Sequence, residues 1–220
     1  MPLPKALRSR SPDRLRDDPR LRAICIAVGL IPPRPMQTPA ETQALSELSD
    51  RARCVVNVGV YEGSSALVFC QALDSHAELH LIDPFEDESG WALREGARAT
   101  PIATRLVTAR HARRAGPEIH WHINRSQDVG RRWQGPPVDL LFVDGDHHPE
   151  AVREDWDVWH PHLSADGVVA FHDARLDFDD GIGNPGPTSV VSDLFRGPAK
   201  LKDWRIFLEV DGLVAVKRVV

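Results

Sequence analysis

Two glycines follow an apolar, β-branched run in the segment Asn57-Val58-Gly59-Val60-Tyr61-Glu62-Gly63-Ser64-Ser65. Where a strand turns into a helix, glycines let a ligand approach the backbone, and serine hydroxyls at the helix N-terminus can meet a carboxylate. The segment therefore predicts a ligand-binding turn. An ordinary glycine turn is the alternative reading.

The spacing of the glycines and an acidic residue after the next apolar run narrow the choice of ligand class. A dinucleotide site expects G-x-G-x-x-G, whereas Gly59 and Gly63 form G-x-x-x-G, which disfavours NAD. Asp83 ends the next apolar run, where a carboxylate can accept hydrogen bonds from both ribose hydroxyls of a nucleoside. An exposed turn residue is the alternative for Asp83. Ser126 and Gln127, after the third run, could touch adenine, and a helix cap at Ser126 fits equally well.

These residues need a scaffold in which strand ends converge. Apolar, β-branched runs alternate with segments of helical periodicity, and these runs are 54–60, 78–83, 118–123, 138–144 and 167–173. Alternating units of this kind predict a parallel sheet covered by helices on both faces, with ligands at the carboxyl ends of the strands. Asp211-Gly212 separates two further runs, 204–210 and 213–217, and predicts a hairpin. We expect an α/β, Rossmann-like doubly wound sheet of seven strands, mostly parallel, with an antiparallel C-terminal hairpin.

The N-terminal part has its own signals. Residues 12–30 predict a short helix that ends at Gly29, before a proline-rich stretch. Thr38, Pro39 and Glu41 form a capping-box signature for a second helix. We therefore divide the chain into an N-terminal extension, 1–35, and one domain, 36–220, and expect a homodimer to use the first helix.

Bulk composition excludes several classes of partner. The net charge is −5, and the 27 basic residues are scattered among 32 acidic ones, which disfavours nucleic acid. No stretch approaches the roughly 18 apolar residues of a membrane span. Three cysteines in apolar surroundings predict buried thiols in a reducing compartment. We expect a cytoplasmic protein with no membrane partner.

Four motifs carry a resemblance to a known family: V-V-N-V-G-V-Y-E-G-S-S, L-I-D-P-F, F-V-D-G-D-H-H-P-E-A-V and L-S-A-D-G-V-V-A-F-H-D. Over residues 36–220 the chain resembles class I S-adenosylmethionine (SAM) dependent methyltransferases. Within them it is most similar to the metal-dependent branch with catechol-type, macrolide-sugar and methylmannose-polysaccharide O-methyltransferases. The resemblance implies a cofactor site made by Asn57, Gly59, Tyr61, Gly63, Ser64, Ser65, Asp83, Ser126 and Asp144. Asn57 departs from the pattern, because the family usually has an acid there.

The resemblance also implies a metal site. Its ligands would be Asp144, at the end of the fourth strand, and His172 and Asp173, after the fifth. The chain between them has the length of a helix and a strand, so both ends emerge on the ligand side. Oxygen ligands suit Mg²⁺, whereas His172 would suit Mn²⁺ or Fe²⁺ better. A calcium loop is excluded, because Pro149 stands where that loop requires glycine.

Methyl transfer to a hydroxyl needs a base and alignment. His147 and Asp144 are the expected catalytic residues: a histidine with an ordinary pKa near 6.5 is neutral at working pH and can take the proton. His172 and Asp144 are rival bases. The implied acceptor is a small molecule with a hydroxyl, by resemblance a saccharide. A metal-independent N-methyltransferase, a hydroxylase-like relative and a non-catalytic SAM or nucleotide-binding module remain alternatives.

The remaining aromatic and histidine residues are interpreted as packing residues, and the long connections as binding loops. His120 and His122 share one face of a strand, and we assign them no function beyond packing. Trp156 and Trp159 could stack on a sugar, but the buried face of a helix is favoured. The long connections 84–117 and 174–200 are expected to act as lids or binding loops.

Overall fold

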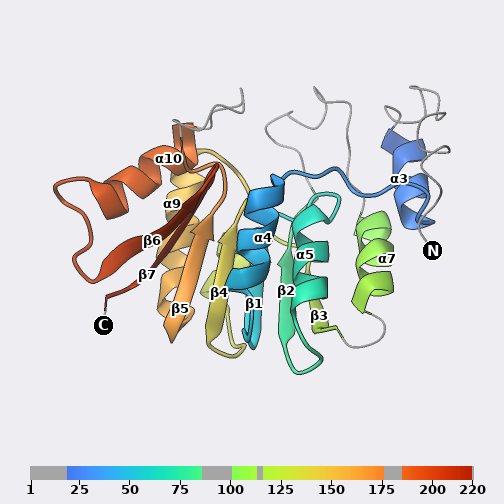
Figure 1. Cartoon of the computed structure of the whole chain (residues 1–220), viewed down its shortest axis with the longest axis horizontal. Helices are drawn as coiled ribbons and strands as arrows, with labels where there is room; N and C mark the ends of the chain where they lie inside the picture. Colours follow the sequence, from blue (N-terminus) through green and yellow to red (C-terminus); the bar gives the residue numbers. More distant parts are fainter. Residues whose placement is uncertain (1–18, 86–100, 113–115, 176–184, 220) are drawn as a thin grey trace.

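A computed structural model describes residues 19–85, 101–112, 116–175 and 185–219 of the chain. One seven-stranded sheet forms its centre, in the order β3-β2-β1-β4-β5-β7-β6 (Figure 1). The strands are β1 (Cys54–Val58), β2 (Glu78–Ile82), β3 (Glu118–His122), β4 (Val138–Val143), β5 (Leu163–Phe171), β6 (Trp204–Val210) and β7 (Leu213–Arg218).

The strand pairings confirm the expected fold. All pairs from β3 to β5 are parallel, whereas β7 runs antiparallel to both β5 and β6. The hairpin turns at Asp211-Gly212, as the sequence predicts, and Asp211 has the left-handed φ of 50° that such turns require. Every residue of β1 is buried, which is typical of a central strand in a sheet covered on both faces.

Helices cover both faces of the sheet. In chain order they are α3 (Pro19–Ala27), α4 (Pro39–Leu48), α5 (Ser64–Ala72), α7 (Pro101–Ala112), α8 (Ser126–Arg131), α9 (Pro149–Trp159), the 3₁₀ turn η1 (His160–His162), α10 (Pro185–Val191) and the π-helical turn η2 (Ser192–Arg196). Figure 1 shows α4, α5 and α7 on the near side of the sheet. Residues of α4 and α5 pack into one core cluster, and residues of α9, α10 and η2 pack into the other.

Several local predictions can be compared with these elements. The Thr38 capping box is confirmed: the Thr38 hydroxyl accepts from Glu41 N at 3.1 Å, and Glu41 Oε2 accepts from Thr38 N at 2.8 Å. The first helix ends at Ala27, close to the predicted Gly29. The fifth strand begins at Leu163, earlier than the predicted 167, because it pairs with β4 across a register irregularity.

Packing predictions were confirmed in the core. Trp156 and Trp159 are buried on α9, so neither is placed to stack on a sugar. Cys54 and Cys70 are buried free thiols, as predicted, and burial raises the pKa of each to about 12. The prediction was wrong for Cys25, which is only half-buried. The two long connections contain helices α7 and α10 and the turn η2, and the parts 86–100, 113–115 and 176–184, on which the expected lids also depend, lie outside the described residues.

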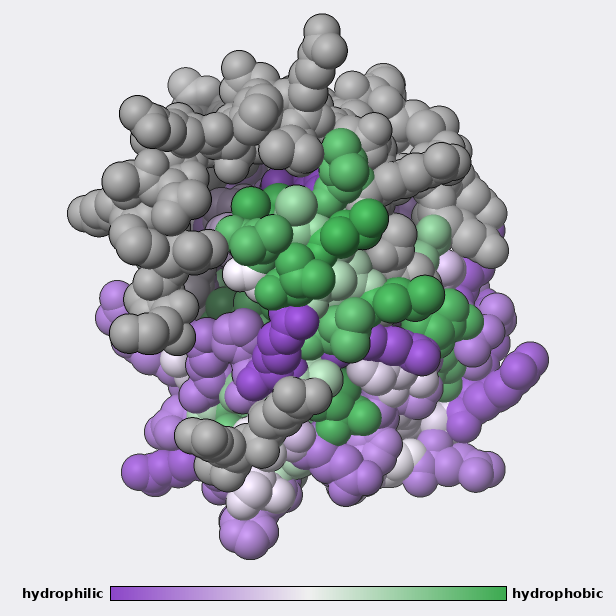
Figure 2. Space-filling model, turned by 90° about the vertical axis from the view of Figure 1, so that its right-hand side faces the viewer, coloured by the Kyte–Doolittle hydropathy of each residue, from purple (hydrophilic) through white to green (hydrophobic). Residues whose placement is uncertain are grey.

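Exposed apolar side chains gather on the face formed by α3, α7 and the residues after α3 (Figure 2). They are Leu21, Ile24, Val28, Leu30, Ile102 and Leu106. The expected homodimer and the boundary at residue 35 stay predictions. Among the described residues, no helix has the length and apolar character needed to cross a membrane.

Candidate functional site

The carboxyl ends of four neighbouring strands are joined by backbone hydrogen bonds. Gly59 N donates to Ile82 O at 3.0 Å, Asp144 N to Val58 O at 2.9 Å and His172 N to Val143 O at 3.0 Å. The predicted residues that follow β1, β2, β4 and β5 therefore lie along one edge of the sheet. This edge is where ligands bind in open α/β sheets.

The glycine turn after β1 fits tightly against the end of β4. Gly59 has φ +83°, and a Cβ atom on it would lie 1.9 Å from the carbonyl oxygen of Asp144. Gly63 has φ +98° and precedes the first residue of α5. Only glycine combines this backbone with such a close approach. The turn therefore has the shape predicted for it, with α5 beginning at Ser64.

Asp83 holds this turn in place. Its Oδ2 accepts hydrogen bonds from Val60 N at 2.9 Å and Tyr61 N at 2.7 Å, and its Oδ1 accepts from Phe85 N at 2.6 Å. A carboxylate offers about four acceptor positions, so capacity for a further donor remains. The half-buried Asp83 is thus a structural part of the turn as well as the predicted ribose ligand.

Asn57 and Ser65 form a buried pair beneath the turn. Asn57 Nδ2 donates to Ser65 Oγ at 2.9 Å, and both residues are buried. Asn57 Oδ1 has no hydrogen-bond partner among the described residues. A buried acceptor without a donor is costly, so this atom is suited to receive a donor from a bound ligand.

Gln37 joins two predicted residues, although it was not itself among the predicted site residues. Its Oε1 accepts from Ser64 Oγ at 2.9 Å, and its Nε2 donates to Asp144 Oδ2 at 3.3 Å. Gln37 is buried although it lies in the proline-rich segment before α4. No sequence signal marks it, because its role depends on that segment crossing the edge of the sheet.

The turn is also tied to the N-terminal helix. Glu62 is buried and accepts from Arg22 Nε and Nη2, each at 2.6 Å, and from Arg34 N at 2.8 Å. Tyr61 has φ 50°, and its carbonyl accepts from the Thr104 hydroxyl at 2.8 Å. Helices α3 and α7 therefore fix the turn that the sequence predicts to bind SAM.

Ser126 is buried, and its surroundings differ from the expected helix cap. The residue that caps α8 is Arg125, which makes no side-chain capping bond, so the alternative of a cap at Ser126 was wrong by one position. Ser126 Oγ accepts from Trp159 Nε1 at 2.7 Å. Gln127 Nε2 donates to the buried Asp155 at 2.8 Å. Both predicted adenine neighbours thus bond to helix α9.

The predicted catalytic and metal-binding residues do meet in one cluster. His172 Nδ1 lies 3.0 Å from Asp144 Oδ1 and 3.5 Å from Asp173 Oδ1. His147 Nε2 lies 3.5 Å from Asp144 Oδ1, and His147 Nδ1 lies 3.9 Å from Asp173 Oδ2. The crossover from β4 through α9 to β5 brings these groups together.

Glu41 completes the cluster from α4. His172 Nε2 lies 3.3 Å from Glu41 Oε2, while Glu41 Oε1 accepts from Gly212 N at 2.8 Å. The sequence indicated Glu41 only as a capping residue. Its second role depends on α4 packing beside the β6–β7 hairpin, which the local pattern does not encode.

Charge pairing shifts the pKa values in the cluster. Burial raises the pKa of Asp144, but His172 and His147 outweigh it and lower that pKa to about 2. Burial lowers the pKa of His172, but Asp144, Glu41 and Asp173 hold it well above its usual value. Burial lowers the pKa of His147 too, but Asp144 and Asp173 raise it overall. The carboxylates thus favour protonated imidazoles here.

A second group of ionisable residues lies on β2 and β3, and it includes His120, for which the sequence predicted packing only. Glu78, His80 and His120 offer ligand atoms that all lie within 4.8 Å of one another, an arrangement that recurs nowhere else in the described ranges. Burial, with His120 and His122 nearby, lowers the pKa of His80 to about 3, so this ring is neutral.

Known proteins can now be compared with this geometry. The uncharacterized protein y4gI of Sinorhizobium fredii is 30% identical over 130 residues, which are 57% of this chain; the chain spans only 14% of that protein's length. The O-methyltransferase TomG of Streptomyces achromogenes was solved with SAM. Its structure matches this chain with a TM-score of 0.61 at 18% identity, and the match covers 100% of this chain and 92% of the TomG chain.

The O-methyltransferase of Bacillus cereus, solved with SAH, matches with a TM-score of 0.58 at 13% identity, and the match covers 100% of this chain and 93% of the Bacillus cereus chain. At these identities the likeness is one of fold, and it agrees with the expected Rossmann-like methyltransferase fold. The sequence model of a family described as "Methyltransferase domain" matches residues 56–174, from β1 to just beyond β5. Because that match spans more than half of the sequence, the chain belongs to this methyltransferase domain family.

Proposed function

We propose that the protein transfers a methyl group from SAM to a hydroxyl of a small molecule. The observation that carries the proposal is the cluster of Asp144, His147, His172 and Asp173 beside the glycine turn after β1. TomG and the Bacillus cereus protein, which share the fold, are O-methyltransferases. A turn that can hold the cofactor beside groups that can take a proton suits such a reaction.

SAM would bind along the glycine turn. Gly59 and Gly63 allow the close approach, Asp83 has acceptor capacity for the ribose, and Asn57 Oδ1 is a buried acceptor suited to the methionine ammonium. Ser64 and Ser65 begin α5, whose N-terminal backbone dipoles favour a carboxylate. The contacts of Tyr61 and of Ser126 with the cofactor stay predictions.

His147 is the best candidate for the base. Its side chain is 29% exposed, whereas that of His172 is 5% exposed and lies between Glu41 and Asp144. A substrate can therefore reach His147 more easily. In the proposed step, an imidazole nitrogen of His147 takes the hydroxyl proton and the oxygen attacks the methyl carbon in line. The bond from that carbon to sulfur breaks, and S-adenosylhomocysteine leaves with the electron pair.

A divalent cation, expected to be Mg²⁺, fits the charge of this cluster. Asp144, Asp173 and Glu41 contribute three carboxylates against two imidazoles, so the cluster is negative even with both rings protonated. Asp144 and Asp173 would hold the ion, which when bound supplies Lewis acidity that favours hydroxyl deprotonation. Ligation by His172 is less favoured, because both of its ring nitrogens already lie beside carboxylates.

The acceptor class rests on resemblance. The motifs are similar to those of sugar O-methyltransferases, which supports a saccharide or glycosylated metabolite as substrate. A screen of saccharide and catechol hydroxyl acceptors, with S-adenosylhomocysteine release as the readout, distinguishes the two classes. If S-adenosylhomocysteine were released with catechols alone, that result would contradict the saccharide preference but not the proposal of O-methyl transfer.

Calorimetric titration of SAM is the primary test, in the wild type, Asp83→Ala and Asp50→Ala. We expect micromolar binding that Asp83→Ala abolishes and that the exposed control Asp50→Ala retains. Because Asp83 also holds the turn, Asp83→Asn serves as a second variant that keeps a carbonyl oxygen, with melting curves to confirm folding. Absence of SAM binding in the folded wild type would overturn the proposed function.

A further inference from the structure

The parallel register of β2 and β3 aligns polar side chains on one face of the sheet. Glu78 pairs with Glu118, His80 with His120 and Ile82 with His122. Because side chains alternate along a strand, these residues share one face, while Leu79, Leu81 and Trp121 point to the other. Three histidines and two carboxylates therefore lie on one face of β2 and the edge strand β3.

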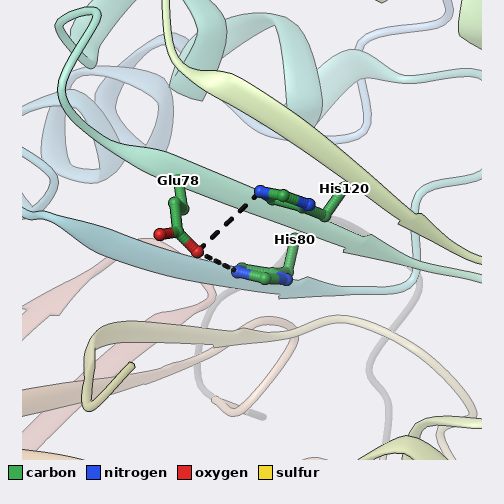
Figure 3. Close-up of side chains that lie close together, drawn as sticks. All are labelled: Glu78, His80 and His120. Atoms are coloured by element: carbon green, nitrogen blue, oxygen red, sulfur yellow. Dashed lines mark hydrogen bonds and ion pairs between the residues drawn. The ribbon is translucent and has the colours of Figure 1, made fainter. Parts of the chain in front are cut away.

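Their ligand atoms lie close together, with Glu78 facing a nitrogen of each ring (Figure 3). Glu78 Oε2 lies 3.2 Å from His80 Nε2 and 3.8 Å from His120 Nε2. Zn²⁺ bound tetrahedrally at about 2.0–2.1 Å from each donor requires donors roughly 3.4 Å apart. The two distances lie on either side of that value, and a rotation of the half-buried His120 ring, which is now nearly parallel to that of His80, would direct both Nε2 atoms at one ion.

Neighbouring groups hold the rings in this orientation. His80 Nδ1 lies 3.1 Å from His122 Nε2, which leaves His80 Nε2 facing Glu78. The His80 ring stacks on His120 with centroids 4.6 Å apart and meets the edge of Trp133 at 4.6 Å. A bound metal is usually supported in this way, with the second ring nitrogen of a ligating histidine hydrogen-bonded to a neighbour.

His120 provides an independent indication. Its Nε2 is shielded from solvent yet makes no hydrogen bond within the part of the chain that the structure describes. The nearest acids are Glu78 at 3.8 Å and Glu118 Oε1 at 3.6 Å, which are beyond hydrogen-bonding distance. Buried polar atoms are normally paired, and a cation between these groups would pair all of them.

We propose that Glu78, His80 and His120 bind a Zn²⁺ ion, with Glu118 or water as the fourth ligand. Two imidazoles and a carboxylate are a donor set that Zn²⁺ favours over Mg²⁺. The site is separate from the methyl-transfer cluster, because β1 lies between β2 and β4 and the trio lies before the carboxyl ends of its strands. An ion there would tie the edge strand β3 to β2.

The test is a Zn²⁺ titration of the full chain by calorimetry in excess Mg²⁺, with tetrahedral Co²⁺ absorption as the spectroscopic readout. We expect one ion per chain, a higher melting temperature and a tetrahedral Co²⁺ spectrum. His120→Ala should abolish all three, and His122→Ala should weaken Zn²⁺ binding roughly 10- to 100-fold. The control is His76→Ala, which changes an exposed histidine in the turn before β2.

Two results would overturn the proposal. One is that the wild type binds no detectable Zn²⁺ or Co²⁺, or that His120→Ala binds both ions as well as the wild type does. The other is binding that persists in His120→Ala but disappears in Asp144→Asn, since the ion would then occupy the methyl-transfer cluster. His120 is the decisive position because it lies on an edge strand and is only half-buried, so its loss should not unfold the chain.

Discussion

His147 is the most accessible histidine of the methyl-transfer cluster, and Asp144 and Asp173 both lie near its ring. His147→Ala should lower kcat by roughly 10²- to 10⁴-fold, because the hydroxyl loses its base, while SAM affinity stays close to that of the wild type. Because its pKa is raised, we expect kcat to increase with pH on a limb above pH 6.5.

The matched control is the next residue, His148, whose exposed side chain pairs with Asp146 at 2.6 Å. His148→Ala should retain kcat and the same pH limb. Steady-state kinetics with an identified acceptor measure both variants. Equal activity of His147→Ala and the wild type would assign the base to another group.

Asp155 gives a second prediction at the residue scale. Burial on α9, with weaker repulsion from Glu154 and Asp146, raises its pKa from 3.8 to about 7 despite a hydrogen bond from Ser126. The folded chain therefore keeps this proton over a range in which the unfolded chain loses it. Its stabilising contribution is complete below about pH 4 and is lost as pH rises through 7.

Asp155→Asn should remove this dependence and raise the free energy of unfolding at pH 8 by an amount on the order of 4 kcal/mol. The amide imitates the protonated acid and still accepts from Gln127. Urea unfolding at pH 5 and pH 8 measures the effect. Asp157→Asn, on the exposed face of the same helix, is the control and should retain the wild-type pH slope.

Among the elements, the turn between β1 and α5 depends most on a single residue. Gly59→Ala would introduce a Cβ atom 1.9 Å from Asp144 O at a φ of +83°. We expect a loss of roughly 1–3 kcal/mol in the free energy of unfolding and weaker SAM binding, because the backbone must shift. Gly197→Ala is the control, with φ −66° and a nearest contact at 3.4 Å, and should retain both properties.

Helix α3 is joined to the same turn through the buried pair of Arg22 and Glu62. Arg22→Ala should lower the free energy of unfolding by about 3 kcal/mol, the lower end for a broken buried pair, because Arg34 N still donates to Glu62. Urea unfolding measures this change. Arg51→Ala removes an exposed pair and should change stability by less than about 1 kcal/mol.

The Arg22→Ala variant also tests the predicted domain boundary at residue 35. If 1–35 were an independent extension, Arg22→Ala would leave the main unfolding transition and SAM affinity unchanged. A cooperative loss of both would instead make α3 part of the domain.

At the scale of the whole molecule, a requirement for a divalent cation would distinguish the proposed O-methyltransferase from the metal-independent N-methyltransferase. Dialysis against EDTA should abolish turnover, and added Mg²⁺ alone should restore it, because Asp144 and Asp173 form an oxygen-rich site. S-adenosylhomocysteine release measures turnover, and calorimetry should show that SAM still binds. Turnover that survives EDTA and Asp173→Ala would favour the metal-independent alternative.

The sequence by itself determined the elements and their order. Buried β-branched runs, the Thr38–Glu41 capping box and the Asp211-Gly212 turn are local signals, and the structure contains each of them. The resemblance of the strand-end motifs to the methyltransferase family also implied one site with Asp144, His147, His172 and Asp173, and these residues do meet, because parallel strands place their carboxyl ends together.

Only the tertiary structure decided which residues from separate elements come into contact. Glu41 reaches His172 because α4 packs beside the hairpin, and Gln37 joins Ser64 to Asp144 because its segment crosses the sheet edge. His80 and His120 face each other through the register of β2 and β3. Such contacts depend on packing between segments far apart in the chain, which local patterns do not specify.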